Sequence, residues 1–214
     1  MKPEVTSKNT SFGKRAIVVG AGLSGLSVAR VLSDHFDEVM IVDRDQLPDD
    51  ITARPGVPQG KQPHALLGGG LKALENLFPG FGNQLMRAGA EPIDPGYDML
   101  SEIPGQDVWP RIKLVLRTYS MSRPLLERTL RRRVERIGNI KVRGGCRVFN
   151  VVSKSNVRAA AGIRCQMVDG SLETVNSDLI VDASGNGSLT LEGPESYWPK
   201  AAGGDPHRCK YALR

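Results

Sequence analysis

Short apolar runs alternate with amphipathic runs in the first part of the chain. Residues 16–19 and 39–42 are continuous apolar runs rich in β-branched side chains, which is typical of strands buried on both faces. Between them, residues 23–32 carry apolar side chains at helical spacing, so we predict an amphipathic helix there. This strand–helix–strand order predicts the start of a parallel α/β sheet.

Glycines mark the turn between the first strand and the helix, which reads Gly20-Ala21-Gly22-Leu23-Ser24-Gly25. In such a turn the first glycine permits the tight bend, the second lets the backbone approach a diphosphate, and the third lets the helix pack closely on the strand. The helix then presents free N–H groups and the positive end of its dipole to the phosphates. The glycine motif alone is weak, because glycines also occur in ordinary turns.

An acidic residue, Asp43, closes the second apolar run eighteen residues beyond Gly25. This is close to the about 20 residues expected for a carboxylate that accepts from a ribose hydroxyl. We therefore predict a dinucleotide site, and the alternative is an ordinary turn with Asp43 as a solvated loop acid. A carboxylate repels a 2′-phosphate, so Asp43 favours FAD or NAD, although the neighbouring Arg44 weakens that distinction.

Weaker patterns continue along the chain. They predict helices over 67–78 and 122–137, a strand over 112–116, and loop-rich stretches over 47–64 and 80–109. Short strands are expected over 140–142, 146–152, 163–167 and 172–175, with a hairpin turn at Asp169-Gly170. Residues 179–181 read as a buried parallel strand that leads into a glycine-bearing loop, where ligands bind in open α/β folds.

Charge adds one alternative to this picture. The chain has a net charge of +6, and its densest basic run is Arg131-Arg132-Arg133. This run is either a phosphate-contacting surface for nucleic acid or a solvated helix face, and the apolar stripe opposite it favours the solvated face. We therefore expect no nucleic-acid partner.

Cysteine and histidine usage points to a reduced, metal-free protein. The three cysteines and three histidines show no metal-ligand spacing, so we predict no metal. No apolar run is long enough to span a bilayer, and the polar N-terminus shows no signal peptide, so we expect a cytoplasmic protein.

Four ordered segments resemble the FAD-dependent monooxygenase superfamily, which includes aromatic-ring hydroxylases, halogenases and geranylgeranyl-type reductases. GAGLSG with Asp43 resembles the motif that binds the ADP part of FAD, and residues 56–80 resemble a segment of a bacterial and fungal subgroup of FAD-dependent oxidoreductases. Residues 122–134 (SRPLLERTLRRRV) resemble the helix whose leading arginine lies near the flavin. Residues 178–188 (DLIVDASGNGS) resemble the second fingerprint of the family, which contacts FAD and the NAD(P)H path.

The resemblance implies roles for individual residues. It places the glycines of the turn around the diphosphate, Asp43 on the adenosine ribose, and Gln62 and His64 beside the flavin ring. Arg123 is a candidate for a charge-assisted hydrogen bond to the cofactor, or alternatively a surface arginine. His64 can equally be a loop histidine without a role. The candidate cofactor-binding residues are Gly20, Ala21, Gly22, Leu23, Ser24, Gly25, Asp43, Arg44, Gln62, His64, Arg123, Val148 and Gly185.

The implied fold is a Rossmann-like FAD-binding fold, mainly a parallel sheet with flanking helices, plus part of a β-rich substrate domain. We expect a disordered segment over 1–13, an FAD-binding domain over 14–190 with partial substrate-domain elements at about 80–120, and an irregular tail over 191–214. Complete relatives are about twice as long and carry a further FAD motif, so the chain resembles a truncated N-terminal portion. We assign no catalytic residue, because in such enzymes the cofactor carries the chemistry.

The implied activity is oxidation of a small organic substrate, in which NAD(P)H reduces the bound flavin and O₂ supplies the oxygen. An arginine that many relatives have after the second fingerprint is replaced here by Leu189 or Leu191, which weakens the expectation of NAD(P)H contact. The alternatives are a flavin-dependent reductase or halogenase and a non-catalytic FAD-binding fragment.

Overall fold

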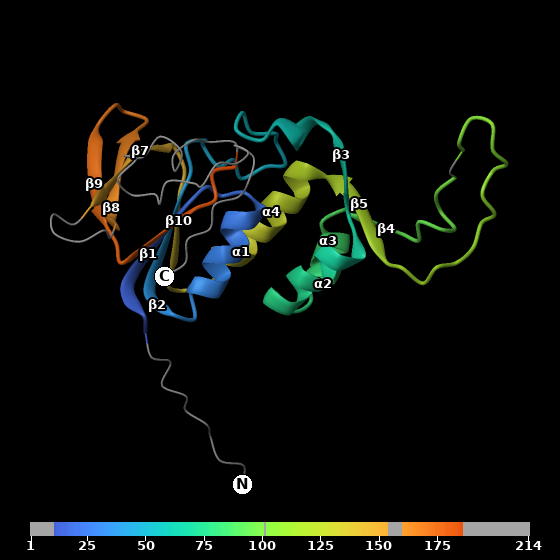
Figure 1. The fold of residues 1–214 in the computed structure, drawn as a ribbon, viewed down its shortest axis with the longest axis horizontal. Helices are drawn as coiled ribbons and strands as arrows, with labels where there is room; N and C mark the ends of the chain where they lie inside the picture. Colours follow the sequence, from blue (N-terminus) through green and yellow to red (C-terminus); the bar gives the residue numbers. More distant parts are fainter. Residues whose placement is uncertain (1–10, 101, 154–159, 186–214) are drawn as a thin grey trace, which may run out of the picture.

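A parallel sheet lies at the centre of the molecule and positions the glycine turn at its edge (Figure 1). The computed structural model describes residues 11–100, 102–153 and 160–185. Within these ranges the sheet has the strand order β10 (Leu179–Asp182), β1 (Gly13–Val19), β2 (Phe36–Val42) and β6 (Ile140–Arg143). All three neighbouring pairs are parallel, and Ala16 of β1 pairs with both Val39 and Leu179. The expected α/β fold with a mainly parallel sheet is confirmed.

Two helices cover one face of this sheet. They are α1 (Leu23–Leu32), which connects β1 to β2, and α4 (Arg123–Val134), which precedes β6. Their apolar sides, including Leu26, Leu126 and Leu130, are buried against Val18 and Ile41 of the sheet. This burial stabilises the layer, because each fully buried aliphatic side chain contributes about 1.5–3 kcal/mol.

An antiparallel sheet packs on the other face. It contains β7 (Cys146–Ser153), β8 (Ala160–Met167) and β9 (Leu172–Asn176). Ile163, Cys165 and Val175 bury their side chains against Ile17 and Val42 of the parallel sheet. The predicted hairpin turn at Asp169-Gly170 is confirmed, and Gly170 adopts a left-handed φ of 83° there.

A further group of short helices and strands lies beyond α4. It comprises the 3₁₀ helix η1 (Pro58–Lys61), β3 (Pro63–Leu66), α2 (Gly68–Leu77), α3 (Phe81–Arg87), β4 (Glu91–Ile93) and β5 (Thr118–Ser122). Strand β5 pairs antiparallel with both β3 and β4. Between β4 and β5, residues 94–100 and 102–117 extend away from the rest of the protein as an arm (Figure 1).

The predicted strand over residues 112–116 is wrong. These residues lie in the arm and form no strand, and the alternating apolar side chains of Ile112, Leu114 and Leu116 are 56%, 49% and 54% exposed. The strand lies a few residues later, at β5, because Tyr119 and Met121 bury their side chains there. The loop-rich stretch 80–109 contains α3 and β4, which the sequence pattern also missed.

The expected terminal segments fall mostly outside the described residues. Of the segment 1–13, only residues 11–13 are described, and Gly13 already begins β1. The expected tail over 191–214 and the last residues of the second fingerprint lie outside the description. Among the described residues, no helix is both long enough and apolar enough to cross a membrane.

Candidate functional site

The glycine turn is shaped by close backbone contacts. Gly20 has a φ of +108°, and a Cβ there would lie 2.4 Å from the carbonyl oxygen of Ala183. A Cβ on Gly25 would lie 1.9 Å from the carbonyl oxygen of Gly20, so any side chain would push helix α1 off the turn. The first and third glycines of the motif are therefore required by the packing of the turn itself.

Gly22 differs from its neighbours, because its backbone is unstrained and the space beside it is open. It has a φ of −77°, and a Cβ built on it would meet no atom within 4 Å. It is also the N-cap of α1, and no described side chain caps the helix. Among the described residues, no side chain caps the N–H groups of the first helical turn, so they are available to a ligand, and the helix dipole adds positive potential there.

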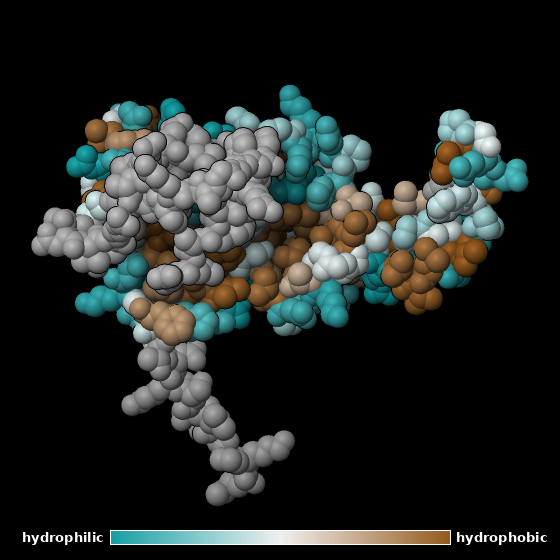
Figure 2. All heavy atoms as spheres, in the orientation of Figure 1, coloured by the Kyte–Doolittle hydropathy of each residue, from teal (hydrophilic) through white to brown (hydrophobic). Residues whose placement is uncertain are grey.

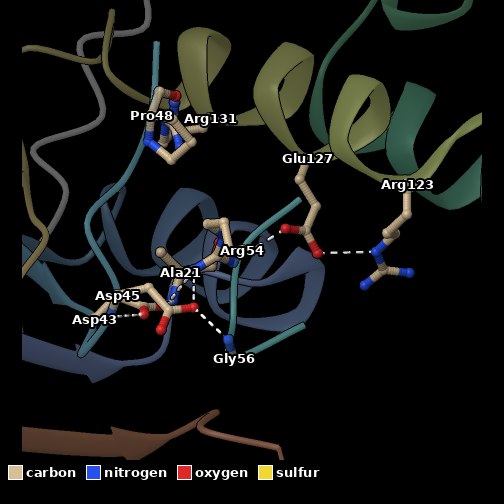
Figure 3. A network of polar contacts seen from close by, with 9 residues as sticks. All are labelled: Ala21, Asp43, Asp45, Pro48, Arg54, Gly56, Arg123, Glu127 and Arg131. Atoms are coloured by element: carbon tan, nitrogen blue, oxygen red, sulfur yellow. Dashed lines mark hydrogen bonds and ion pairs between the residues drawn. The ribbon is translucent and has the colours of Figure 1, made fainter. Parts of the chain in front are cut away.

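Asp43 lies directly beside this turn (Figure 3). It follows the last residue of β2, and its carboxylate accepts hydrogen bonds from the N–H of Ala21 at 2.7 Å and the N–H of Asp45 at 2.9 Å. The residue is only 9% exposed. The sequence motif therefore folds as expected, with the acid facing the glycine turn.

Arg54 joins this site, although the sequence motifs do not include it. Its Nη1 lies 3.2 Å from Oδ2 of Asp43 and 3.5 Å from Oδ2 of Asp45, and its Nη2 lies 3.0 Å from Oε2 of Glu127 (Figure 3). Burial lowers the pKa of the Arg54 guanidinium, but the charges of Asp43 and Glu127 outweigh burial and raise it overall.

Glu127 also contacts Arg123 at the start of α4. Its Oε1 accepts from Nε of Arg123 at 2.8 Å, which makes an i,i+4 ion pair on the helix. Ser122 caps α4, and its side chain accepts from the N–H of Leu125. Pro124 in the first turn further fixes the point where the helix begins. The position of Arg123 is thus set both by its cap and by its ion pair.

Most of the residues described above line one cavity of about 690 Å³. This volume is typical of small-molecule and cofactor sites. Its lining includes nine of the candidate residues, namely Gly20, Gly22, Leu23, Ser24, Asp43, Arg44, Arg123, Val148 and Gly185. It also includes residues that the sequence did not single out, among them Arg54, Glu127, Arg147, Phe149 and Asn150. The cavity lies at the carboxyl ends of β1, β2 and β10, which is the edge where ligands bind in open α/β sheets.

Four candidates are not among the lining residues of this cavity. Ala21 is buried and bonds Asp43, and Gly25 lies beneath the turn against Gly20. Gln62 is exposed at the end of η1. His64 is half-buried on β3, where burial and the charge of Arg123 lower the pKa of its imidazole.

The second fingerprint closes the cavity from the side of β10. Asp182 ends the strand, and its Oδ1 accepts from the N–H of Ser184 at 3.0 Å and from the hydroxyl of Ser184 at 2.6 Å. Ala183 donates its N–H to the carbonyl of Val19, so the loop runs against the glycine turn. The two motifs, far apart in sequence, therefore meet at one edge of the sheet.

The basic run of α4 is engaged within the molecule. Arg128 and Arg132 donate to the carbonyl of Asp49, Arg131 donates to the carbonyl of Pro48, and Arg133 donates to the carbonyl of Pro79. The contacts with Pro48 and Asp49 hold the loop that follows β2 against the helix, and the contact with Pro79 joins the helix to the turn after α2. Among the described residues, no cluster of three or more His, Cys, Asp or Glu is arranged to hold a metal ion.

The residues present fit an adenine dinucleotide. Free N–H groups at the start of α1 face the cavity beside open space at Gly22, which suits a diphosphate. Asp43 lies at the same end of the cavity, where a carboxylate can accept from ribose hydroxyls. Arg123 offers a cation at the start of α4.

Comparison with known proteins supports the same fold. The chain is similar to Protein Rv3254 of Mycobacterium tuberculosis, with 31% identity over 191 residues that cover 81% of this chain. The myxobacterial chondrochloren halogenase CndH, an FAD-dependent halogenase, superposes with a TM-score of 0.60 at 21% identity over 84% of this chain. The tetrameric form of 2-methyl-3-hydroxypyridine-5-carboxylic acid oxygenase superposes with a TM-score of 0.53 at 20% identity over 79% of this chain.

The chain spans well under half the length of each of these proteins. It covers 38% of the mycobacterial protein and 39% of both the halogenase and the oxygenase. No known protein-family profile matches the chain. The solved structures show that the chain shares the fold of part of an FAD-dependent halogenase and of part of an oxygenase.

Proposed function

We propose that this chain binds FAD and works as part of an FAD-dependent oxidoreductase. The observation that carries the proposal is the hydrogen bond between the Asp43 carboxylate and the N–H of Ala21, which brings the acid and the glycine turn to one end of one cavity. The similarity to FAD-dependent oxygenases and halogenases supports the same cofactor.

Different residues of the site contact different parts of the cofactor. The N–H groups of Leu23 and Ser24 bind the diphosphate, and the missing side chain of Gly22 leaves room for it. Asp43 accepts from the ribose hydroxyls. Arg123 donates a charge-assisted hydrogen bond to a cofactor oxygen, and Val148 offers its backbone to the adenine. Gly185 allows close approach at the loop after β10.

The finer proposal is a monooxygenase. When bound, FAD supplies transfer of two electrons from NAD(P)H to O₂, so that one oxygen atom enters an organic substrate and the other leaves as water. A reductase or halogenase built on the same site is the alternative, as is a chain that binds FAD without turnover. Substrate-stimulated oxidation of NAD(P)H with formation of a hydroxylated product distinguishes the monooxygenase from all three.

Binding of FAD is tested by a matched pair of glycine variants. We expect the wild-type chain to bind FAD and show the visible absorption of oxidised flavin. Gly22→Ala should weaken FAD binding about ten-fold, because the added methyl group occupies space beside the diphosphate, while the melting temperature stays unchanged. Gly138→Ala is the control, because a Cβ there also meets no atom within 4 Å and lies outside the cavity.

Isothermal titration calorimetry with FAD measures the affinity of each variant, and thermal melting measures its stability. A wild-type chain that binds no FAD would overturn the proposal. Equal FAD affinity for wild type and Gly22→Ala would contradict the assigned position of the diphosphate, even if the wild type binds FAD.

A further inference from the structure

Glu127 bridges two arginines inside the cavity wall. Its Oε1 accepts from Nε of Arg123 at 2.8 Å, and its Oε2 pairs with Nη2 of Arg54 at 3.0 Å (Figure 3). The Glu127 side chain is only 9% exposed, and the side chains of Arg54 and Arg123 are 6% and 15% exposed. A carboxylate that binds one cation with each oxygen has little freedom to rotate, so it fixes both partners.

Arg54 carries these contacts to the other end of the cavity. Besides Glu127, its guanidinium contacts Oδ2 of Asp43 at 3.2 Å and the carbonyl oxygen of Ala21 at 3.5 Å. Asp43 in turn accepts from the N–H of Ala21. A continuous set of polar contacts therefore runs from the glycine turn through Asp43, Arg54 and Glu127 to Arg123.

The geometry of Arg123 shows what this arrangement leaves free. Glu127 binds its Nε, whereas no residue in the described part of the chain accepts from its two terminal nitrogens. Arg123 also lines the cavity. The bridge thus holds the base of the guanidinium and leaves two charged N–H₂ groups for a ligand.

We propose that Glu127 is a positioning residue for the cofactor, holding Arg123 in place for the flavin half, while Arg54 holds Asp43 in place for the adenosine half. This inference rests on the proposed FAD function. It assigns no chemical step to Glu127, which acts only through the two arginines. A merely structural ion-pair cluster would instead affect both halves of the ligand equally.

Comparison of FAD with ADP separates the two halves, because ADP contains the adenosine and diphosphate but no flavin. Arg123→Met should lower the affinity for FAD about ten-fold or more and leave the affinity for ADP unchanged, because one charge-assisted hydrogen bond is lost. Glu127→Gln should show the same pattern, since its amide cannot accept from both arginines while Arg54 keeps Asp43 and Asp45 as partners. Arg54→Met should lower the affinity for both ligands.

A double variant tests whether Glu127 acts through Arg123. We expect Arg123→Met with Glu127→Gln to bind FAD no more weakly than Arg123→Met alone, because the positioned group is already absent. Where Glu127→Gln does not fold, Glu127→Asp serves instead, since it keeps the charge and shortens the reach to one arginine; the same FAD-selective loss is expected.

The outcomes separate this inference from the proposed function. Equal losses for FAD and ADP in the Glu127 variant, an unchanged FAD affinity, or additive losses in the double variant would each overturn the positioning role. A wild-type chain that binds ADP but not FAD, or neither, would overturn the proposed function instead.

Discussion

His64 is a titrating side chain whose pKa responds to the charges of Arg123 and Glu127. It lies half-buried on β3, and its pKa is lowered first by burial and next by the positive charge of Arg123, while Glu127 acts in the opposite direction. The imidazole therefore titrates below its ordinary value of 6.5. The folded protein then binds fewer protons here than the unfolded chain, so this contribution to stability is complete above pH 6.5 and is lost as the pH falls through the lowered pKa.

We predict that the pKa of His64 changes when either neighbouring charge, Arg123 or Glu127, is removed. Arg123→Met should raise the pKa of His64 toward 6.5, because a nearby positive charge is removed. Glu127→Gln should lower it further, because a nearby negative charge is removed. NMR titration of the imidazole carbon-bound protons measures both shifts, with His35 as the internal reference. Identical His64 titration curves in all variants would contradict the assigned proximity.

Single residues differ in how far the sequence could predict them. The glycines and Asp43 follow a motif whose spacing is fixed by backbone geometry, so the turn could be predicted from the sequence. Arg54 and Glu127 are 73 positions apart and belong to no spaced motif, so nothing in the sequence indicated their ion pair. The i,i+4 spacing of Arg123 and Glu127 was the available signal, because it predicts a pair on one helix face.

Between elements, Glu38 ties three strands of the parallel sheet together. From β2 its carboxylate accepts from Nε of Arg15 on β1 at 2.7 Å and from Nζ of Lys141 on β6 at 2.6 Å. The hydrogen bond from Lys141 is the main cause that lowers the pKa of Glu38, and Arg15 adds to it against the opposing effect of burial. The pair energies are modest, about 0.2–1 kcal/mol each, because the partners are partly exposed.

A pH-dependent loss of stability follows from this carboxylate. Its stabilisation is complete above the ordinary pKa of 4.5 and is lost as the pH falls through the lowered folded pKa. Glu38→Gln should therefore reduce the free energy of unfolding by about 1 kcal/mol at pH 7 and by less as the pH drops below 4.5. Urea unfolding of wild type and variant at pH 7 and at a pH below 4.5 measures this difference. The same difference in the free energy of unfolding at both pH values would argue against it.

Strands with a continuous apolar run could be predicted from the sequence, whereas the short elements α3 and β4, which have no such run, could not. The apolar runs of β1 and β2 are largely buried, and β10 is half-buried beside β1, so their continuous apolar runs predicted all three strands. The alternation at residues 112–116 predicted a strand that has no partner strand among the described residues. Alternation indicates a strand only where a second strand covers its backbone, and a sequence pattern does not contain that information.

At the scale of the molecule, the arm between β4 and β5 carries most of the exposed large apolar side chains among the described residues. Figure 2 shows apolar residues gathered there, away from the packed layers. The exposed large apolar side chains of the arm are Tyr97, Met99, Leu100, Ile103, Val108, Trp109, Ile112, Leu114, Val115 and Leu116. Contiguous apolar surface of this kind promotes association in water.

This surface predicts dye binding and concentration-dependent association of the isolated chain. The double variant Trp109→Ser with Leu114→Ser should lower the fluorescence of bound anilinonaphthalene sulfonate and reduce association, with little change in melting temperature, because both side chains are about half exposed or more. Arg111→Ser in the same arm is the control and should change neither. Dye fluorescence equal to the wild type in the double variant would show that the arm is not the apolar surface that binds the dye.

The pairing of β1 with β10 has a consequence for synthesis of the chain. The glycine turn is made early, but its backbone neighbour Ala183 and the strand partner Leu179 leave the ribosome only near the end of the described sequence. At typical elongation rates this interval lasts about 10–30 s. During that time the nascent polypeptide carries the glycine turn without the β10 wall that completes its cavity, so a ligand of the proposed kind can be enclosed there only after β10 has been made.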